Sequence, residues 1–499
     1  MSNLVGLGIN MITQMIIPRG LGPQAYGDFH FLTKAFTNII VFFNMGTSSA
    51  FFIKLSQNNK DKGLITFYSF YIASVIVLTF LLVIWLHLFG ALPHFFPDQQ
   101  AIYVYMGAFW GLNLWLVQLA SILGDAYGLT VALEKVRIVQ KLLGLFLILG
   151  IYVTKSFSLM VFFVYHYVIL LFLSVGLVIV VLRAGMLTLP LEWLSKAQFM
   201  SYGHTFLIFV RPLILFMVIY SAVEITDRWL LQKFSGSIQQ GYYSLGLQVS
   251  ELCILFASAM TPLLQRELAK AFAEQNIQAM GVLFRRYLPP LYFLTAYLAG
   301  FIAIHANNVV YILGGERFAQ AENVIFIMGL YAMQVAYGQL GSGVFYATGQ
   351  TKLLSQIGIF TTLLFFSVSY FLLVPSEMYG LGAGAVGLAT KMFLWNTTVV
   401  NLQIFFASRF LRLSYRWFAV HQVMVSLALL GVAWSGQVVV KQFIQATDMS
   451  SHLTFFLLSG ILYTILTIVL IFVAPGILGV TRKELKSFSN KAIGMLHKH

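Results

Sequence analysis

The sequence predicts an all-α protein that crosses the membrane many times, and its composition is the first reason. Of its 499 residues, 59% are hydrophobic and only 9% are charged, and the mean hydropathy is +0.85. Soluble domains carry roughly a quarter charged residues. A chain this apolar has too little polar surface to cover a soluble globule. The second reason is that the apolar residues form long runs, separated by short polar or glycine- and proline-containing segments.

The apolar runs predict about fourteen membrane-spanning helices, because a helix needs roughly 20 apolar residues to cross a bilayer. The predicted spans are 2–17, 27–53, 64–90, 100–123, 142–153, 158–182, 200–223, 237–263, 287–305, 321–346, 353–374, 382–406, 417–440 and 453–478. Pro18, Arg19 and Gly22-Pro23 end the first run. The later breaks are a polar loop at 54–62, a proline-containing turn at 91–98, a basic loop at 125–141, a charged turn at 224–236, an amphipathic interfacial segment at 265–286 and a tight turn at 349–352.

The distribution of basic residues predicts the orientation. The chain carries 30 lysines and arginines against 16 acidic residues, a formal net charge of +14. With a cytoplasmic N-terminus, about 21 of the basic residues fall in cytoplasmic loops and about six in outer loops. Such loops lie beside anionic lipid, so the net charge does not indicate a nucleic-acid partner. We therefore predict a multi-pass protein of the cytoplasmic (inner) cell membrane with both termini in the cytoplasm.

The sequence lacks the features of an enzyme. No loop exceeds roughly 25 residues, well short of an independently folding catalytic domain. The chain contains no Gly-x4-Gly-Lys-[Ser/Thr] phosphate loop, no His-Glu-x-x-His and no Cys-x-x-Cys. Its single cysteine, Cys253, lies in an apolar run and cannot form a disulfide within the chain. We predict no catalytic residue, no metal and no cofactor.

A short motif occurs twice. Arg19-Gly-Leu-Gly22 is followed by Gly27, and Lys233-Phe-Ser-Gly236 is followed by Gly241. Each copy has a basic residue, a glycine, four residues, a second glycine, a nearby aromatic residue and then an apolar run. The repeat indicates two related halves, each opened by the same helix–turn–helix unit.

Charged side chains inside the apolar runs are the first candidate functional residues, since a charge at a helix centre costs roughly 2.5 kcal/mol or more in the bilayer. Lys34, Arg211 and Lys391 are such residues. We predict that they line a hydrated, cationic central cavity suited to an anionic substrate. The alternative is that Lys34 and Lys391 extend to an interface, while Arg211 pairs with a carbonyl or with Glu251.

Uncharged polar residues extend the predicted cavity. Asn38 lies one turn after Lys34, and His204 shares a helix face with Arg211. Gln248 belongs to a polar stripe on the span at 237–263. We add these three side chains to the predicted substrate site.

A further set of charged residues is assigned to coupling or gating. Glu224, Asp227 and Arg228 lie in the predicted outer turn at 224–236, where they form either a gate-side ion-pair cluster or a plain solvated turn. Proton or sodium antiport through an acidic group is one energy source, and downhill flipping driven by product consumption is the other. The remaining coupling or gating candidates are Glu251, Asp125 and Arg19.

Several longer motifs give the chain a family resemblance. They are Leu21-Gly-Pro-x-x-Tyr26-Gly-x-Phe29, Asp227-Arg-Trp-Leu-Leu-Gln-Lys-Phe-Ser-Gly236, Gly314-Gly-Glu-Arg-Phe318, Ala347-Thr-Gly-Gln-Thr-Lys352 and Tyr379-Gly-Leu-Gly-Ala-Gly-Ala-Val-Gly387. Together with about fourteen helices, the set resembles the polysaccharide flippases. These are the oligosaccharide-lipid exporters of the multidrug/oligosaccharidyl-lipid/polysaccharide superfamily.

The resemblance implies both an architecture and a function. The architecture is two pseudo-symmetric six-helix lobes, residues 1–183 and 200–407, joined by a linker at 184–199 and followed by two helices and a basic cytoplasmic tail at 408–499. The implied function is flipping of a polyprenyl-diphosphate-linked oligosaccharide, a surface-polysaccharide or O-antigen-type repeat unit, from the cytoplasmic to the outer leaflet by alternating access. The implied partners are this lipid-linked oligosaccharide diphosphate, membrane lipid and polysaccharide polymerase or assembly proteins.

Three other functions remain as alternatives. A drug/cation antiporter of the same superfamily needs acidic cavity groups, whereas the buried charges here lean positive. A peptidoglycan lipid-precursor flippase has the same architecture, and the sequence separates it poorly from a polysaccharide flippase. A polytopic glycosyltransferase or polymerase is disfavoured, because such enzymes present a large outer loop with catalytic groups.

Overall fold

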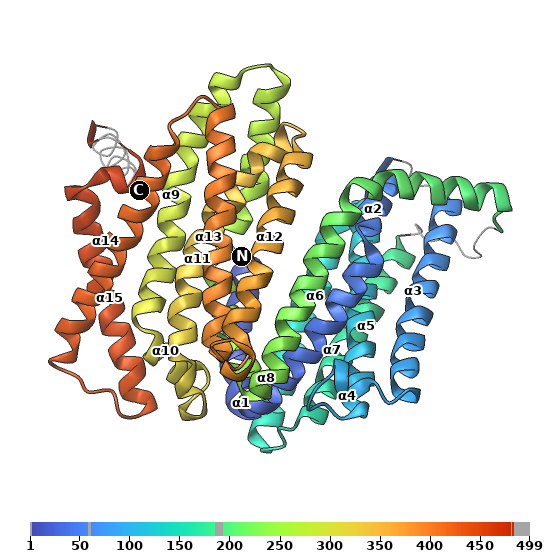
Figure 1. Cartoon of the computed structure of the whole chain (residues 1–499), viewed down its shortest axis with the longest axis horizontal. Coiled ribbons are helices and arrows are strands. Elements are labelled where there is room, and N and C mark those ends of the chain that lie inside the picture. The colour runs from blue at the N-terminus through green and yellow to red at the C-terminus, as the bar shows by residue number, and fades with distance from the viewer. Residues whose placement is uncertain (1, 58–60, 185–192, 481, 484–499) are drawn as a thin grey trace. The chain divides into compact units, whose positions relative to one another are not determined.

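The computed structural model describes residues 2–57, 61–184, 193–480 and 482–483, and every regular element within these ranges is a helix (Figure 1). The predicted all-α class is therefore confirmed. Ten of the described helices are long and apolar enough, by length and composition, to cross a membrane. The chain is an all-α polytopic membrane protein. Half of the predicted linker at 184–199, residues 185–192, and the tail from 484 onward lie outside the described residues.

The helices follow one another along the chain with short connections. The α-helices are α1 (Ser2–Asn44), α2 (Thr47–Gln57), α3 (Lys62–Leu88), α4 (Leu92–Phe95), α5 (Ala101–Ala126), α6 (Thr130–Val153), α7 (Leu159–Arg183), α8 (Lys196–Ala273), α9 (Ile277–Ile304), α10 (Ala306–Leu313), α11 (Glu322–Ala347), α12 (Thr351–Leu373), α13 (Gly384–Phe410), α14 (Tyr415–Lys441) and α15 (Met449–Val473). Three short 3₁₀ helices are η1 (Glu316–Ala321), η2 (Ser376–Met378) and η3 (Pro475–Leu478).

Side-chain caps fix where some helices begin. The Asp61 carboxylate accepts a hydrogen bond of 2.9 Å from the backbone N–H of Leu64 at the start of α3. At the start of α15, hydrogen bonds from Ser451 hold the pKa of the Asp448 carboxyl below its usual range. Both carboxylates satisfy N–H groups that have no partner inside the helix.

The chain divides into two compact units. The first comprises Met1–Gly241 and Leu373–Gly384, and the second comprises Tyr242–Leu372 and Ala385–His499. Helix α8 therefore contributes to both units. The lobe boundaries implied by the family resemblance stay a prediction.

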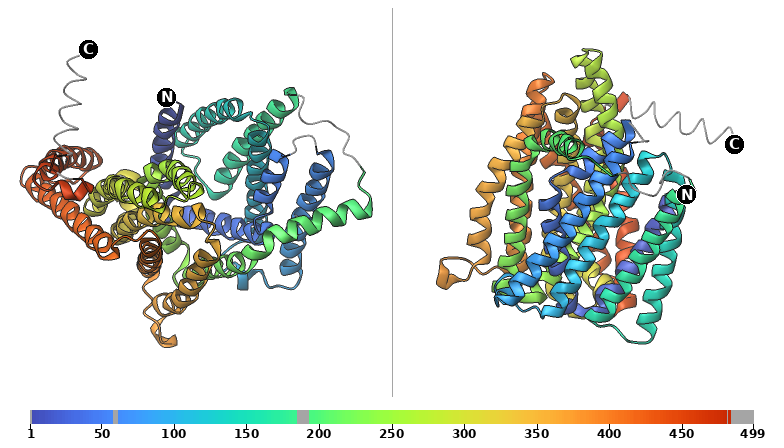
Figure 2. Two further views of the ribbon diagram at one scale, coloured as in Figure 1. Left: turned by 90° about the horizontal axis from the view of Figure 1, so that it is seen from above. Right: turned by 90° about the vertical axis from the view of Figure 1, so that its right-hand side faces the viewer.

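In the first unit α5 is the central helix. It packs against α1, α2, α3 and α7, and these helices stand side by side (Figure 2). Trp115 of α5 lies in an apolar core with Phe51 of α2 and Tyr68 of α3, whose rings stack. The Tyr68 hydroxyl is hydrogen-bonded to Thr47 and Ser48 at 3.2 and 3.1 Å. Close packing and satisfied polar groups hold such a bundle together, because lipid is as apolar as the core.

In the second unit α9 is central and packs against α11 and α14. Tyr292 of α9 and Tyr337 of α11 meet edge to face, with ring centroids 4.5 Å apart. The Tyr292 hydroxyl donates to the Gln422 carbonyl at 3.0 Å and lies 2.7 Å from the Ser426 hydroxyl. An unpaired hydroxyl in apolar surroundings would be costly, so these bonds tie α9 to α14.

The turn predicted at Gly22-Pro23 coincides with a sharp kink at Gly22, which joins two helical parts of α1. The predicted turn at 224–236 is helical up to its last residue, because α8 bends only at Gly236. A run of polar residues does not by itself end a helix, because the backbone hydrogen bonds form regardless of side-chain polarity. The predicted charged turn is therefore wrong.

Other predicted boundaries shift for the same reason. Most of the predicted loop at 125–141 is the first part of α6, and the segment at 265–286 forms the facing ends of α8 and α9 instead of a separate interfacial helix. The predicted span at 27–53 is interrupted between α1 and α2. The 20-residue rule detects the part of a helix that fits the bilayer, so it misses turns that continue into water.

The two bends have the same backbone conformation. Gly22 has φ 72° and ψ 170°, and Gly236 has φ 77° and ψ −179°. This region of backbone space is accessible essentially only to glycine. The two copies of the sequence motif therefore fold alike, and each bend depends on its glycine.

The second glycine of each copy lies at a close crossing of α1 and α8. A Cβ atom on Gly27 would lie 1.8 Å from the Ser237 carbonyl oxygen, and one on Gly241 would lie 2.1 Å from the Pro23 carbonyl oxygen. Pro23 and Ser237 each follow the bend glycine of their own copy. The contact is therefore reciprocal, and the two backbones touch where no side chain intervenes. We call this contact the glycine crossing.

We expect Gly27→Ala and Gly241→Ala each to destabilise the first unit by about 3 kcal/mol, because the added methyl group meets backbone that cannot move aside. The measurement is the thermal unfolding midpoint of the purified protein in detergent. Gly150→Ala in α6 is the matched control, since a Cβ there has no neighbour within 4 Å. Equal midpoints for Gly27→Ala and Gly150→Ala would contradict the crossing.

Candidate functional site

An ion pair joins α1 to α8 in the first unit. The Lys34 ammonium lies 2.8 Å from a Glu224 carboxylate oxygen, and the two side chains are 35% and 26% exposed. Each residue lies twelve positions from the bend glycine of its own helix, Gly22 or Gly236. Twelve residues of helix span about 18 Å, so the pair lies well along both helices from the glycine crossing.

Asn38 follows Lys34 by one turn on the same face of α1. The residue is only 4% exposed, and its side-chain nitrogen has no hydrogen-bond partner among the described residues. Buried amide groups are usually paired, so an unused donor beside a lysine is notable. The arrangement offers a positive charge and a neutral N–H donor to an anion.

A polar network surrounds the glycine crossing. The Asp28 carboxylate accepts hydrogen bonds from the Gln99 side chain, at 2.6 Å, and from the Ser237 hydroxyl. Gln232 donates to the Ser237 hydroxyl at 2.9 Å and to the Pro97 carbonyl at 3.2 Å. The network thus joins α1, the segment before α5 and both sides of the bend in α8. Such bonds fix the crossing in one geometry.

The remaining members of the predicted gate cluster point into the unit. Arg228 is 6% exposed and donates to the Gln240 side chain at 3.1 Å. Gln240 in turn donates to the Arg228 carbonyl. Asp227 is equally well buried. A solvated turn, one of the two sequence-based interpretations of Glu224, Asp227 and Arg228, is therefore wrong.

The other predicted residues of the first unit do not join this group in any described contact. Arg211 and His204 are exposed side chains on α8. Arg19 is half-buried in α1, before the bend. Asp125 accepts a hydrogen bond of 2.9 Å from Thr130 at the start of α6, a local contact between neighbouring helices.

Three predicted residues belong to the second unit. Lys391 of α13 is 4% exposed, and its ammonium lies 5.6 Å from the centre of the Trp395 ring. Gln248 is half-buried and Glu251 is exposed, both on the part of α8 that lies beyond Gly241. An ammonium above an indole ring is stabilised by the ring's negative face.

The sequence analysis missed the network at the crossing. Asp28, Gln99, Gln232 and Ser237 are single polar residues in otherwise ordinary positions. The available signal was position: Asp28 directly follows the second glycine of one copy, and Ser237 directly follows the bend glycine of the other.

Neither a family model nor a curated protein matches the chain, but its fold matches solved structures. An inward closed structure of the lipid II flippase MurJ matches with a TM-score of 0.67 at 13% identity, over 94% of this chain and 97% of that chain. An inward-facing multidrug resistance MATE family transporter of the MOP superfamily matches with a TM-score of 0.59 at 14% identity, over 83% of this chain and 95% of that chain. A MOP superfamily transporter from Pyrococcus furiosus, described by the reverse polarity of its binding pocket, matches with a TM-score of 0.53 at 13% identity, over 82% of this chain and 94% of that chain. At these identities the likeness shows the fold.

We expect Ser237→Ala to destabilise the first unit by about 1–3 kcal/mol, because the Asp28 carboxylate and the Gln232 amide each lose a partner. The thermal unfolding midpoint of the purified protein tests this. Ser235→Ala is the control, because Ser235 makes neither contact although it directly precedes the bend glycine of the same helix. If both variants unfold at the wild-type temperature, the network does not stabilise the crossing.

Proposed function

We propose that this chain, which has the fold of MOP superfamily transporters, is a flippase that moves a polyprenyl-diphosphate-linked oligosaccharide from the cytoplasmic to the outer leaflet. Alternating access between its two parts carries the head group, while the lipid tail stays in the bilayer. Likeness to a lipid II flippase over nearly the whole of both chains supports a lipid-linked substrate. The observation that carries the proposal is the Lys34–Glu224 ion pair.

The Lys34–Glu224 ion pair is suited to an exchange in which a substrate phosphate replaces the Glu224 carboxylate. A diphosphate needs a positive partner while its head group crosses the membrane, and Lys34 is a cation that its carboxylate partner leaves partly exposed. Pairs this exposed contribute only about 0.2–1 kcal/mol. A diphosphate carries more negative charge than the single Glu224 carboxylate, so it attracts the Lys34 ammonium more strongly. An incoming diphosphate can therefore replace Glu224 beside Lys34 and accept a second bond from Asn38.

Glu224 thereby becomes the gating group of the proposal. While Lys34 pairs with Glu224, the ammonium is neutralised and α1 is tied to α8. Binding of the diphosphate frees the carboxylate and releases that tie. Substrate binding and movement of α8 relative to α1 are coupled in this way without any further energy source.

The other predicted residues keep supporting roles in the proposal. Further contacts to the head group come from Arg211, His204, Lys391 and Gln248. The coupling and gating candidates beside Glu224 are Glu251, Asp125, Asp227, Arg228 and Arg19. The proposed location is the cytoplasmic membrane with both termini in the cytoplasm, and the proposed partners include a polysaccharide polymerase or assembly proteins.

We expect Lys34→Ala to reduce flipping at least tenfold and Lys34→Arg to retain most of it, because only the first removes the charge. Proteoliposomes that hold the purified protein and a fluorescent lipid-diphosphate oligosaccharide provide the measurement. Transfer between leaflets is read from the fraction of label that an impermeant quencher reaches.

The charge-swapped double variant Lys34→Glu/Glu224→Lys separates a substrate role from a structural one. It restores an ion pair between α1 and α8, so we expect wild-type thermal stability with flipping still reduced at least tenfold. Wild-type flipping by the swapped variant would contradict the substrate role of Lys34. Preference for lipid II over the oligosaccharide-linked lipid would instead support the peptidoglycan-precursor alternative.

A further inference from the structure

A cavity of about 540 Å³ opens between the start of α9 and the turn that joins α13 to α14, within the second unit. We call it the basic notch. Its charged lining residues are Arg285 of α9 and Arg412 of the turn, and its apolar lining includes Ile277, Val282, Leu411 and Leu413. The turn passes close to α9 at Gly281, where a Cβ atom would lie in van der Waals contact, 3.4 Å from the Leu411 carbonyl oxygen.

The two arginines of the basic notch have no acidic partner. Among the described residues, neither Arg285 nor Arg412 takes part in an ion pair, in contrast to Lys34, Arg137 and Arg266. The Arg285 guanidinium lies 5.3 Å from the centre of the Trp417 ring, which orients it without neutralising its charge. An uncompensated pair of guanidinium groups favours an anion.

Three more exposed arginines lie next to these elements in the sequence. They are Arg286, Arg409 and Arg416. The basic residue count assigns this end of the helices to the cytoplasmic side. Basic side chains near an anionic leaflet contribute about 1 kcal/mol each to membrane-lipid attraction.

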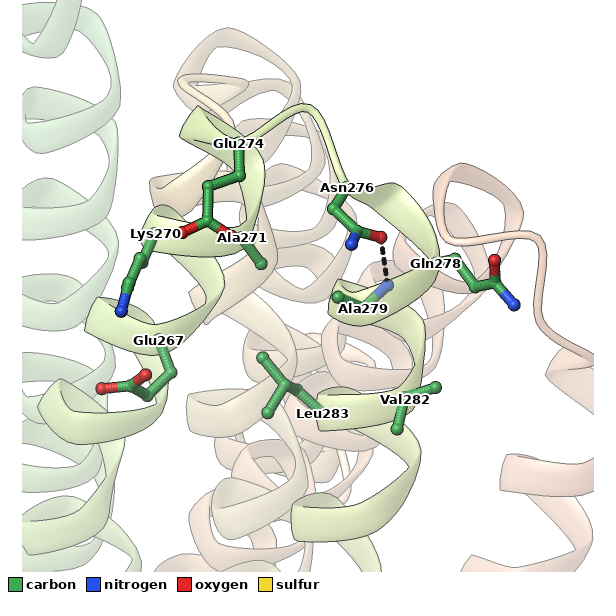
Figure 3. A pocket seen from close by; sticks show the side chains of 9 residues that line it. All are labelled: Glu267, Lys270, Ala271, Glu274, Asn276, Gln278, Ala279, Val282 and Leu283. Carbon is green, nitrogen blue, oxygen red and sulfur yellow. Dashed lines mark hydrogen bonds between the residues drawn. The ribbon is translucent and has the colours of Figure 1, made fainter.

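The adjacent cavity, between the end of α8 and the start of α9, has a different character. It has a volume of about 520 Å³, shares Gln278 and Val282 with the basic notch, and has Glu267, Lys270 and Glu274 of α8 as its charged lining residues (Figure 3). Arg266 pairs with Glu267 at 2.8 Å. Charges of both signs meet in this cavity, so it has no preference for anions. Of these two neighbouring cavities, the basic notch is the one whose lining has an excess of positive charge.

We propose that the basic notch binds the phosphate head group of an anionic membrane lipid. Guanidinium groups bind phosphate through two parallel hydrogen bonds, which suits Arg285 and Arg412 better than lysine would. The apolar lining accepts the glycerol and the first methylenes of the acyl chains, which a free phosphate ion does not possess. Helix α9, which supplies five of the lining residues, and α14, which follows the turn, are long and apolar enough to span the membrane, so the notch lies at the end of two candidate spans.

The test is native mass spectrometry of the purified full-length protein with added lipid. We expect cardiolipin or phosphatidylglycerol to be retained and phosphatidylcholine not. The variant Arg285→Gln/Arg412→Gln should lower the retained fraction about tenfold. Arg266→Gln/Lys270→Gln removes the same charge from the end of α8, at the adjacent cavity, and should leave retention unchanged. Should the glutamine variant fail to fold, Arg285→Lys/Arg412→Lys serves instead and should retain less lipid than wild type.

Three results would overturn the proposal. The first is an equal loss of lipid retention in both charge-removing variants, which would show that retention depends on net charge alone. The second is equal retention of phosphatidylcholine. The third is arginine-dependent binding of inorganic pyrophosphate without retention of lipid, which would assign the notch to a soluble anion.

Discussion

The rest of the first unit depends on one steric constraint, the contact between the backbones of α1 and α8. Neither Gly27 nor Gly241 has room for a single methyl group, because each faces a carbonyl oxygen of the other helix. The bends at Gly22 and Gly236 bring these positions together, and both require a backbone conformation that only glycine adopts readily. Once the crossing is fixed, helix geometry alone determines how far along α1 and α8 the side chains of Lys34 and Glu224 lie.

Polar groups in this protein are few, and their pairing is correspondingly informative. At the crossing, Asp28 is satisfied by two side-chain donors, so it serves to hold the helices. Further along the same helices, Lys34 has a partly exposed carboxylate partner and Asn38 has an unused donor. Fully satisfied groups specify one structure, whereas partly satisfied groups are available to a ligand. Asp28 belongs to the first kind and Asn38 to the second.

The fold class could be predicted from composition, and the motif repeat could be predicted from two short glycine patterns. The contacts between helices could not be predicted from the sequence. Lys34 and Glu224 were both singled out, yet nothing in the sequence shows that they meet, because pairing across helices depends on the angle set at the crossing. The predicted turn at 224–236 failed because charge is a poor indicator of where a helix ends. Ser237 and Gln99 carry no charge and no motif, so only their neighbours reveal what they do.

The two glycine motifs also bear on how the protein evolved. Two copies of one pattern with one backbone geometry are what duplication of an ancestral segment leaves behind. Counted from the bend glycines, Lys34 and Gln248 occupy the same place, so one copy carries an ammonium group where the other carries an amide. The two copies have the same residue at the glycine positions, where a larger side chain does not fit. They differ at Lys34 and Gln248, where other side chains fit. One copy can thus change its side chains while the glycine contact between the copies stays intact.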